Sequence, residues 1–204
     1  MSAIKVSLKN GEYLNINFSP GDIMIDCGAN IGDVSAPFAV MGATILAYEP
    51  NQHAYQKLSE RFKNSKNVKC LNSAVSFEDG KAKLFLHESA NVDPLKYSTG
   101  SSLVAGKENV NSEDYIETEL VDLAKVIRRI KKVFKKNVHI LKIDIEGAEC
   151  DLMERLMDED LLKDIPYVFV ETHEEKIPSL RDKTKNMIDR AKKLELYNIN
   201  FNWI

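Results

Sequence analysis

The stretch from Ile23 to Asp33 constrains the fold of this 204-residue chain more than any other part of the sequence. An apolar run ends in the acid Asp26, and Gly28 and Gly32 follow with three residues between them. This order predicts a buried strand, a tight loop and then a helix. Because glycine lacks a Cβ, such a loop can bring its backbone close to a ligand. An ordinary strand-to-helix turn would show the same pattern. Whether this loop binds a ligand therefore has to be judged from the rest of the chain.

Predicted strands and helices alternate along the whole chain. Beside 23–26, apolar runs predict strands at residues 43–48, 68–71, 81–86, 115–121, 138–144, 166–172 and 197–204. Apolar positions at helical spacing predict helices at residues 31–40, 52–62, 122–135, 145–157 and 179–194. This alternation is typical of a doubly wound parallel sheet. No repeat or Pro/Gly/Ser-rich linker divides the chain, so we expect a single domain over residues 1–204.

Residues 1–20 are predicted to form a β-hairpin ahead of this fold. Apolar residues alternate with polar ones on either side of Asn10-Gly11: Ile4, Val6 and Leu8, then Leu14, Ile16 and Phe18. A two-residue loop would place the two apolar rows on opposite faces. A three-residue loop, Lys9-Asn10-Gly11, pairs Val6 with Leu14 and keeps one apolar face. We therefore predict the longer loop, with Gly11 in the left-handed conformation.

Composition argues against several classes of protein. The formal net charge is −3, whereas general nucleic-acid binders are usually basic, so we expect no nucleic-acid partner. No apolar run approaches membrane-spanning length and the first residues lack a signal-peptide apolar region, so we expect no membrane association. Cys27, Cys70 and Cys150 lie in or beside apolar segments without metal-ligand spacing. Such cysteines are typically buried and free of disulfides in proteins of a reducing compartment, and we expect a cytoplasmic protein.

Polar residues stand at the ends of the predicted strands: Asp26, Glu49, Asn72, Asp144 and Glu171. The carboxyl ends of parallel strands meet at one edge of a sheet, which is where doubly wound proteins bind their ligands. We therefore expect these five residues to converge on one crevice.

Glu49 indicates what the crevice holds. It lies about twenty residues beyond the glycine loop, where an acid accepts hydrogen bonds from the ribose hydroxyls of an adenosine-containing cofactor. NAD and S-adenosylmethionine both carry that ribose. NAD-binding loops have glycine at the position that Asn30 holds here. The Asp26 carboxylate would repel a pyrophosphate but attract a sulfonium and an amino group, which favours S-adenosylmethionine.

With these residues in view, the chain resembles the FkbM-type methyltransferase family over roughly residues 20–175. The matching segments are Ile25-Asp26-Cys27-Gly28-Ala29-Asn30-Ile31-Gly32, Tyr48-Glu49-Pro50-Asn51, Gly100-Ser101-Ser102-Leu103, Leu141-Lys142-Ile143-Asp144-Ile145-Glu146-Gly147-Ala148-Glu149 and Val170-Glu171-Thr172-His173. The resemblance implies an α/β fold of the class I methyltransferase type. This fold is a doubly wound, mostly parallel Rossmann-like sheet, here with an N-terminal β-hairpin and an antiparallel C-terminal strand. The resemblance also implies methylation of a hydroxyl oxygen, commonly on a sugar or a natural product.

The resemblance assigns a cofactor role to individual residues. The predicted S-adenosylmethionine site consists of Asp26, Gly28, Ala29, Asn30, Gly32, Glu49, Pro50, Asn51, Asn72, Ser73, Ala74 and Asp144. Within it, the glycine loop would line the methionine portion, Asp26 would hold the amino group and Glu49 would bind the ribose. Residues 72–74 would border the adenine, although a plain strand-to-loop turn would explain them equally well.

Asp144, Glu146 and His173 follow strand ends and are the predicted catalytic residues, one of which would accept the proton of the hydroxyl. His173 titrates nearest to neutrality, and Glu146 lies where a helix dipole favours its ionised form. The three could also hold a divalent metal, but the sequence fixes no geometry for them and we expect none. Lys142 lies inside a buried strand, and we expect it to pair with a carboxylate.

The acceptor is expected to be a small molecule or a glycan. Its recognition would rest on the irregular segment 88–112, on the hairpin or on a partner subunit of a homo-oligomer. Two other classes of function stay open from the sequence. One is a different Rossmann enzyme, such as an NAD-dependent dehydrogenase, and the other is a non-catalytic cofactor-binding module.

Overall fold

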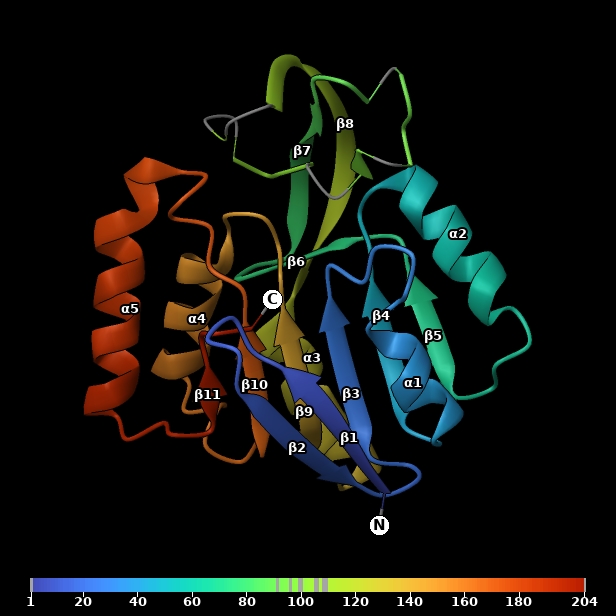
Figure 1. The fold of residues 1–204 in the computed structure, drawn as a ribbon, viewed down its shortest axis with the longest axis vertical. Helices are drawn as coiled ribbons and strands as arrows, with labels where there is room; N and C mark the ends of the chain where they lie inside the picture. Colours follow the sequence, from blue (N-terminus) through green and yellow to red (C-terminus); the bar gives the residue numbers. More distant parts are fainter. Residues whose placement is uncertain are drawn as a thin grey trace.

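A computed structural model of the chain describes residues 2–90, 92–95, 97–98, 101–104, 107 and 110–203 (Figure 1). The strands of its main sheet are β3 (Ile23–Cys27), β4 (Thr44–Tyr48), β5 (Val68–Leu71), β9 (Val138–Ile143), β10 (Tyr167–Val170) and β11 (Ile199–Asn200). Within the described residues their order is β11-β10-β9-β3-β4-β5, and every pairing is parallel. The order reverses between β3 and β9, so the predicted doubly wound, Rossmann-like sheet is confirmed.

Each face of this sheet is covered by its own layer. One face packs against α3 (Leu123–Phe134), α4 (Glu149–Asp158) and α5 (Arg181–Lys193), and the other against α1 (Ser35–Val40), α2 (Gln52–Phe62) and the N-terminal hairpin. Strand β3 shows the consequence for the sequence. Ile23 and Ile25 belong to the first core and Met24 to the second, and all five residues of the strand are buried. A strand covered on both faces needs the continuous apolar run seen in the sequence.

The N-terminal hairpin has the predicted register. Strands β1 (Ser2–Ser7) and β2 (Tyr13–Phe18) pair Val6 with Leu14. The amide of Gly11 donates to Leu8, and Gly11 has φ +80°, which is the left-handed conformation expected for a three-residue loop. The hairpin lies on the main sheet near β9 and β10 (Figure 1), where the Tyr167 hydroxyl accepts from the Asn17 amide. Its Ile16 and Phe18 belong to the same core as Ile140 and Phe169.

The prediction of an antiparallel C-terminal strand is wrong, because β11 runs parallel to β10. After α5 the chain returns to the end of the sheet at which β10 begins. There the Asn198 side chain donates to the carbonyls of Leu162 and Ile165, and the Val168 amide donates to Asn198. A strand that starts beside the start of its neighbour has to run in the same direction. The pairing covers residues 199–200 of the predicted 197–204, and Ile204 lies outside the described residues.

The first helix begins later than predicted, at Ser35 in place of residue 31. Gly28, Asn30 and Gly32 all have positive φ, so the chain between β3 and α1 cannot be a right-handed helix. Pro37 then lies in the first turn of α1, where its missing N–H removes no helical hydrogen bond.

A second, smaller sheet stands beyond the carboxyl edge of the main sheet (Figure 1). It consists of β6 (Ala74–Ser76), β8 (Val110–Asp122) and β7 (Gly80–His87), in that order, with β8 antiparallel to β7. A bridge between Phe85 and Ser102 attaches the 101–104 segment to β7. This sheet therefore brings β7 and the described parts of the irregular segment over the strand ends; Gly100 lies outside the described residues.

All three cysteines are free, with Cys27 and Cys150 buried and Cys70 partly buried. Among the described residues, no helix combines the length and apolarity needed to span a bilayer.

Candidate active site

A cleft opens at the carboxyl edge of the main sheet, beneath β7. Its lining comes from the loop after β3, the ends of β4, β5 and β9, strands β6 and β7, and the irregular segment. The lining residues are Gly28, Asn30, Glu49, Pro50, Ser73, Ala74, Val75, Leu84, Ser98, Ser101, Leu103, Asp144, Ile145 and Glu146.

Glu49 is fixed in the cleft by backbone amides. The amide of Asn51 donates to Oε1 and that of Asn30 to Oε2, both at 2.8 Å. Burial raises the pKa of Glu49 to about 7, and these two amides offset part of that shift. A carboxylate has about four lone-pair positions, so two remain after these contacts. Glu49 can therefore accept two further hydrogen bonds from a ligand in the cleft.

The loop that follows β3 uses its own amides internally. Gly28 and Ala29 donate to the Tyr48 carbonyl, Asn30 donates to Glu49, Ile31 to the Asn30 side chain and Gly32 to Ala29. A pyrophosphate could bind these amides only by displacing those contacts. The loop is therefore not arranged as an open cradle for an anion.

A glycine is required at position 28 because the backbone at the end of β9 leaves no room for a side chain. A Cβ at this position would lie 1.8 Å from the carbonyl oxygen of Asp144, and Gly28 has φ +79°. The close approach joins the β3 loop to the end of β9, so that Asn30 and Asp144 line the same cleft.

Asp26 lies beneath the cleft in a buried ion pair. It is cross-strand neighbour to Lys142, whose Nζ is 3.2 Å from its Oδ1 and 3.3 Å from Oδ2 of Asp144. The Ser35 hydroxyl donates to Oδ2 of Asp26, and Lys142 also donates to the Gly28 carbonyl. Burial lowers the pKa of Lys142, but the two carboxylates outweigh it and raise the pKa overall. The expected carboxylate partner of Lys142 is thus present, and the pair ties β3 and β9 together.

The irregular segment is held over the cleft by matching polar pairs. Asn30 Nδ2 donates to Ser98 Oγ at 3.0 Å, and Asn51 Nδ2 donates to Ser101 Oγ at 3.1 Å. Asn51 also caps α2 through the amides of residues 53 and 54. Further along, Ser102 donates to the Glu146 carbonyl. We call residues 98 and 101–104 the strap, because these contacts anchor them at the cleft.

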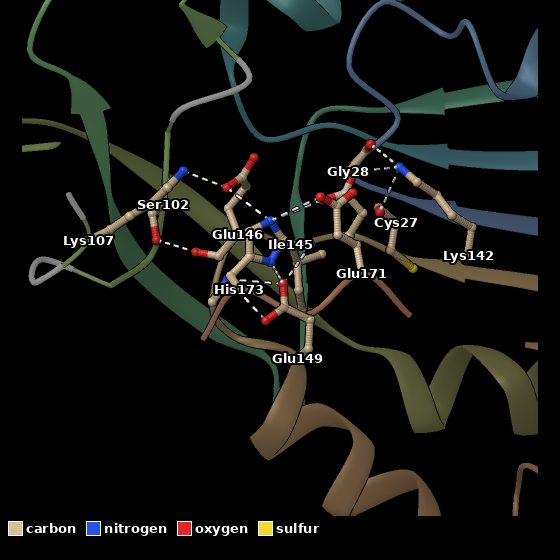
Figure 2. A network of polar contacts seen from close by, with 12 residues as sticks. Cys27, Gly28, Ser102, Lys107, Lys142, Ile145, Glu146, Glu149, Glu171 and His173 are labelled. Atoms are coloured by element: carbon tan, nitrogen blue, oxygen red, sulfur yellow. Dashed lines mark hydrogen bonds and ion pairs between the residues drawn. The ribbon is translucent and has the colours of Figure 1, made fainter. Parts of the chain in front are cut away.

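His173 sits behind the cleft wall beside Glu146, Glu149 and Glu171 (Figure 2), and Asp144 is a further carboxylate close to its ring. Its Nδ1 lies 2.8 Å from Glu149 Oε1, and its Nε2 lies 3.2 Å from Glu146 Oε2, 3.7 Å from Asp144 Oδ1 and 3.8 Å from Glu171 Oε1. Burial lowers the pKa of His173, but the acids, Glu149 first, raise it overall. The Lys107 ammonium pairs with Glu146 from the other side. This end of the cleft therefore favours a positive charge between its carboxylates.

The structure brings most of the predicted residues together, but not all of them. Eight line the cleft: Gly28, Asn30, Glu49, Pro50, Ser73, Ala74, Asp144 and Glu146. Asp26 is fully buried beneath it, and Gly32 packs against α2. Asn72 turns away and donates to the carbonyls of Glu49 and Pro50. Ala29 and Asn51 are buried close by, and His173 touches the cleft only through Asp144 and Glu146.

Sequence reasoning did not single out Glu149 or Lys107. Glu149 is part of the matched segment at 141–149, but an acid in the first turn of a helix also serves the helix dipole, so the pattern assigns it no partner. Lys107 stands in the irregular segment without any periodic neighbour. Leu84 of β7 is buried and lines the cleft, but the alternation at residues 81–86 predicts a strand without indicating a ligand contact.

Comparison with known proteins gives one family. The family described as "Methyltransferase FkbM domain" matches residues 26–194 of the 204. The match includes every residue of the cleft lining. No curated protein matches the chain.

Proposed function

The chain belongs to the FkbM methyltransferase family, and we propose that it transfers a methyl group from S-adenosylmethionine to a hydroxyl oxygen of a sugar or a small natural product. The observation that carries this proposal is the cleft in which Glu49 and Asp144 stand at the ends of different strands of one sheet.

The strand order supports a direction for the cofactor across the cleft. From β5 to β9 the strands are β5, β4, β3 and β9. Ser73 and Ala74 after β5 would border the adenine, and Glu49 at the end of β4 would bind the ribose hydroxyls. The loop after β3 would flank the methionine portion. The methyl group would then face the end of β9, where Asp144 and Glu146 stand.

The acceptor end has the chemistry that methylation of an oxygen requires. S-adenosylmethionine supplies a sulfonium-bound methyl group that an aligned oxygen can displace. The protein has to hold that oxygen in line and remove its proton. Asp144 and Glu146 line the cleft and His173 contacts both, so this group would bind the hydroxyl and take up its proton. Strap residues Ser101 and Leu103 also line the cleft and would contact the cofactor or the acceptor.

Calorimetric titration with S-adenosylhomocysteine, the demethylated product, tests the cofactor. The wild-type chain, Glu49→Gln and the exposed control Glu60→Gln would each be titrated with this ligand and with NAD. We expect micromolar binding by the wild type and the control, at least tenfold weaker binding by Glu49→Gln, and none to NAD. Absence of binding by a folded wild-type chain would argue against the proposal, and NAD binding would favour a different Rossmann enzyme.

A panel of sugars and hydroxylated small molecules then tests the reaction. Methyl transfer to oxygen, detected by the mass of the product, would support the assignment. Cofactor binding with no turnover on any acceptor would instead favour the non-catalytic module.

A further inference from the structure

The environment of the His173 ring has one feature that the proposed function does not use. The side chain is 1% exposed, and among the described residues neither ring nitrogen has a hydrogen bond of good geometry, although Nδ1 lies 2.8 Å from Glu149 Oε1. Nε2 nevertheless points toward the carboxylate of Glu146 on the cleft wall (Figure 2), and it lies 3.7 Å from Oδ1 of Asp144. A buried ring nitrogen that faces two acids without a hydrogen bond requires a partner.

Glu149 determines which nitrogen is available. Its Oε1 lies 2.8 Å from Nδ1 of His173, and its carboxylate accepts from the amides of Ile145 and Gly147. These amides hold Glu149 in place, and its Oε1 is the carboxylate oxygen nearest to the ring, so we assign the ring hydrogen to Nδ1. The lone pair of Nε2 is then directed at Asp144 and Glu146. Histidine ligands of metal ions have this arrangement, in which the other nitrogen donates to a carboxylate.

The spacing of the three groups suits one ion. One ligand atom from each of Asp144, Glu146 and His173 lies within 4.8 Å of the others. Nε2 is 3.2 Å from Glu146 and 3.7 Å from Asp144. Two ligands about 2.1 Å from one ion stand roughly 3 to 4 Å apart, so both distances are compatible with shared coordination.

The lysines nearby occupy only part of this group. Lys142 pairs with Oδ2 of Asp144, whereas Oδ1 faces His173. Lys107 pairs with Oε2 of Glu146, which is also the oxygen 3.2 Å from Nε2, so a bound ion would take Oε1 or replace the Lys107 ammonium at Oε2. The backbone of Glu146 has φ +55°, a conformation that is costly for a residue with a side chain. The turn at residues 145–147 is thus maintained against strain, and it places Glu146 between Lys107 and His173.

We propose that Asp144, Glu146 and His173 bind one divalent cation of the Mg²⁺ or Mn²⁺ class at the acceptor end of the cleft. Two carboxylates and one imidazole favour such an ion and leave coordination positions open. These positions would hold the acceptor oxygen and orient it toward the methyl group, a role that rests on the proposed function. Recognition would extend to acceptors with two neighbouring hydroxyls, which can occupy two open positions at once.

Titration with Mn²⁺, followed by the electron paramagnetic resonance signal of the free ion, tests the site on the full chain. Mn²⁺ would be added to the wild type, Asp144→Asn, His173→Ala and Asp151→Asn. Asp151 is an exposed acid on α4 that pairs with Lys183, so its variant controls for loss of a nearby charge. We expect one ion per wild-type chain, at least tenfold weaker binding in the first two variants and unchanged binding in Asp151→Asn. Circular dichroism confirms that each variant is folded, and Glu146→Gln replaces any that is not.

Binding of S-adenosylhomocysteine in the same samples separates this inference from the proposed function. Cofactor binding without Mn²⁺ binding would overturn the cation site and leave the methyltransferase proposal intact. Equal Mn²⁺ affinity in wild type and Asp144→Asn would also overturn it, because the ion would then lie elsewhere. Site-specific Mn²⁺ binding without cofactor binding would support the cation site and count against S-adenosylmethionine.

Discussion

The carbonyl oxygen of Asp144 occupies the space in which a side chain on Gly28 would begin. A Cβ on Gly28 would lie 1.8 Å from that oxygen. The Asp144 amide donates to the Cys27 carbonyl beside it. The loop after β3 and the end of β9 are thus in direct backbone contact, and the two sides of the cleft depend on one glycine.

Substituting Gly28 with alanine should be far more harmful than substituting other glycines. Gly11 has φ +80° with no atom within 4 Å of its Cβ position, and Gly80 has neither constraint. We expect Gly80→Ala to be neutral and Gly11→Ala to cost about 1 kcal/mol through its backbone conformation alone. Gly28→Ala adds the clash with Asp144 and should cost at least about 2 kcal/mol more, together with loss of S-adenosylhomocysteine binding. Urea unfolding of the three variants measures this, and equal losses for Gly28→Ala and Gly11→Ala would refute the explanation.

Affinity for S-adenosylhomocysteine should increase with pH through Glu49. Its pKa in the ligand-free protein is raised to about 7. Ribose hydroxyls that donate to the carboxylate stabilise its ionised form, so the bound state has a lower pKa. Binding therefore releases a proton below about pH 7, and affinity falls by up to about tenfold per pH unit on acidification. Above that pH the dependence on Glu49 levels off.

Calorimetry between pH 5.5 and pH 8 measures this dependence. Glutamine at position 49 has the same shape as glutamate but does not titrate. The weaker binding of Glu49→Gln should therefore lack the pH dependence that Glu49 causes. The difference between the two chains removes protons exchanged by the ligand itself. The same pH slope in both would show that Glu49 does not contact the ribose.

The strap should contribute to cofactor affinity through Ser98 and Ser101. Each side chain accepts a hydrogen bond from an asparagine of the main fold. One such bond contributes about 0.5–1.5 kcal/mol, so each alanine variant should weaken S-adenosylhomocysteine binding by about two- to tenfold. Ser179→Ala, an exposed serine outside the cleft, is the control. Unchanged affinity in the Ser98→Ala/Ser101→Ala double variant would mean that the strap does not close over the cofactor.

Much of the fold followed from local patterns in the sequence. The register of the hairpin could be predicted because only one loop length keeps Val6 and Leu14 on the same face. The small sheet was harder to predict. Strand β8 begins at Val110, five residues before the predicted start at Tyr115. The stretch that follows, Asn111-Ser112-Glu113-Asp114, is polar throughout, and the register with β7 shifts there, between the Phe85–Tyr115 and His87–Val110 pairs. A polar stretch without apolar alternation does not predict a strand.

The candidate site was predictable where it depends on strand ends and not where it depends on turns. Glu49 lines the cleft as its spacing from the glycine loop implied. The group around His173 depends on the left-handed backbone of Glu146 and on the hydrogen bonds of Glu149. Neither feature can be predicted from the spacing of residues in the sequence. Asp26 shows the opposite case, in which an expected ligand contact is replaced by a buried ion pair with Lys142.

That ion pair gives the last prediction. Lys142→Met would leave Asp26, which is fully buried, without its cation. Removing one partner of a buried pair typically costs about 3–5 kcal/mol, because the other charge stays desolvated. Asp26→Asn in the same chain removes that charge while its amide can still contact the Ser35 hydroxyl. The double variant should therefore be more stable than Lys142→Met alone. Urea unfolding of the two single variants and the double variant measures the coupling, and purely additive losses would show that Asp26 and Lys142 do not stabilise the fold as a pair.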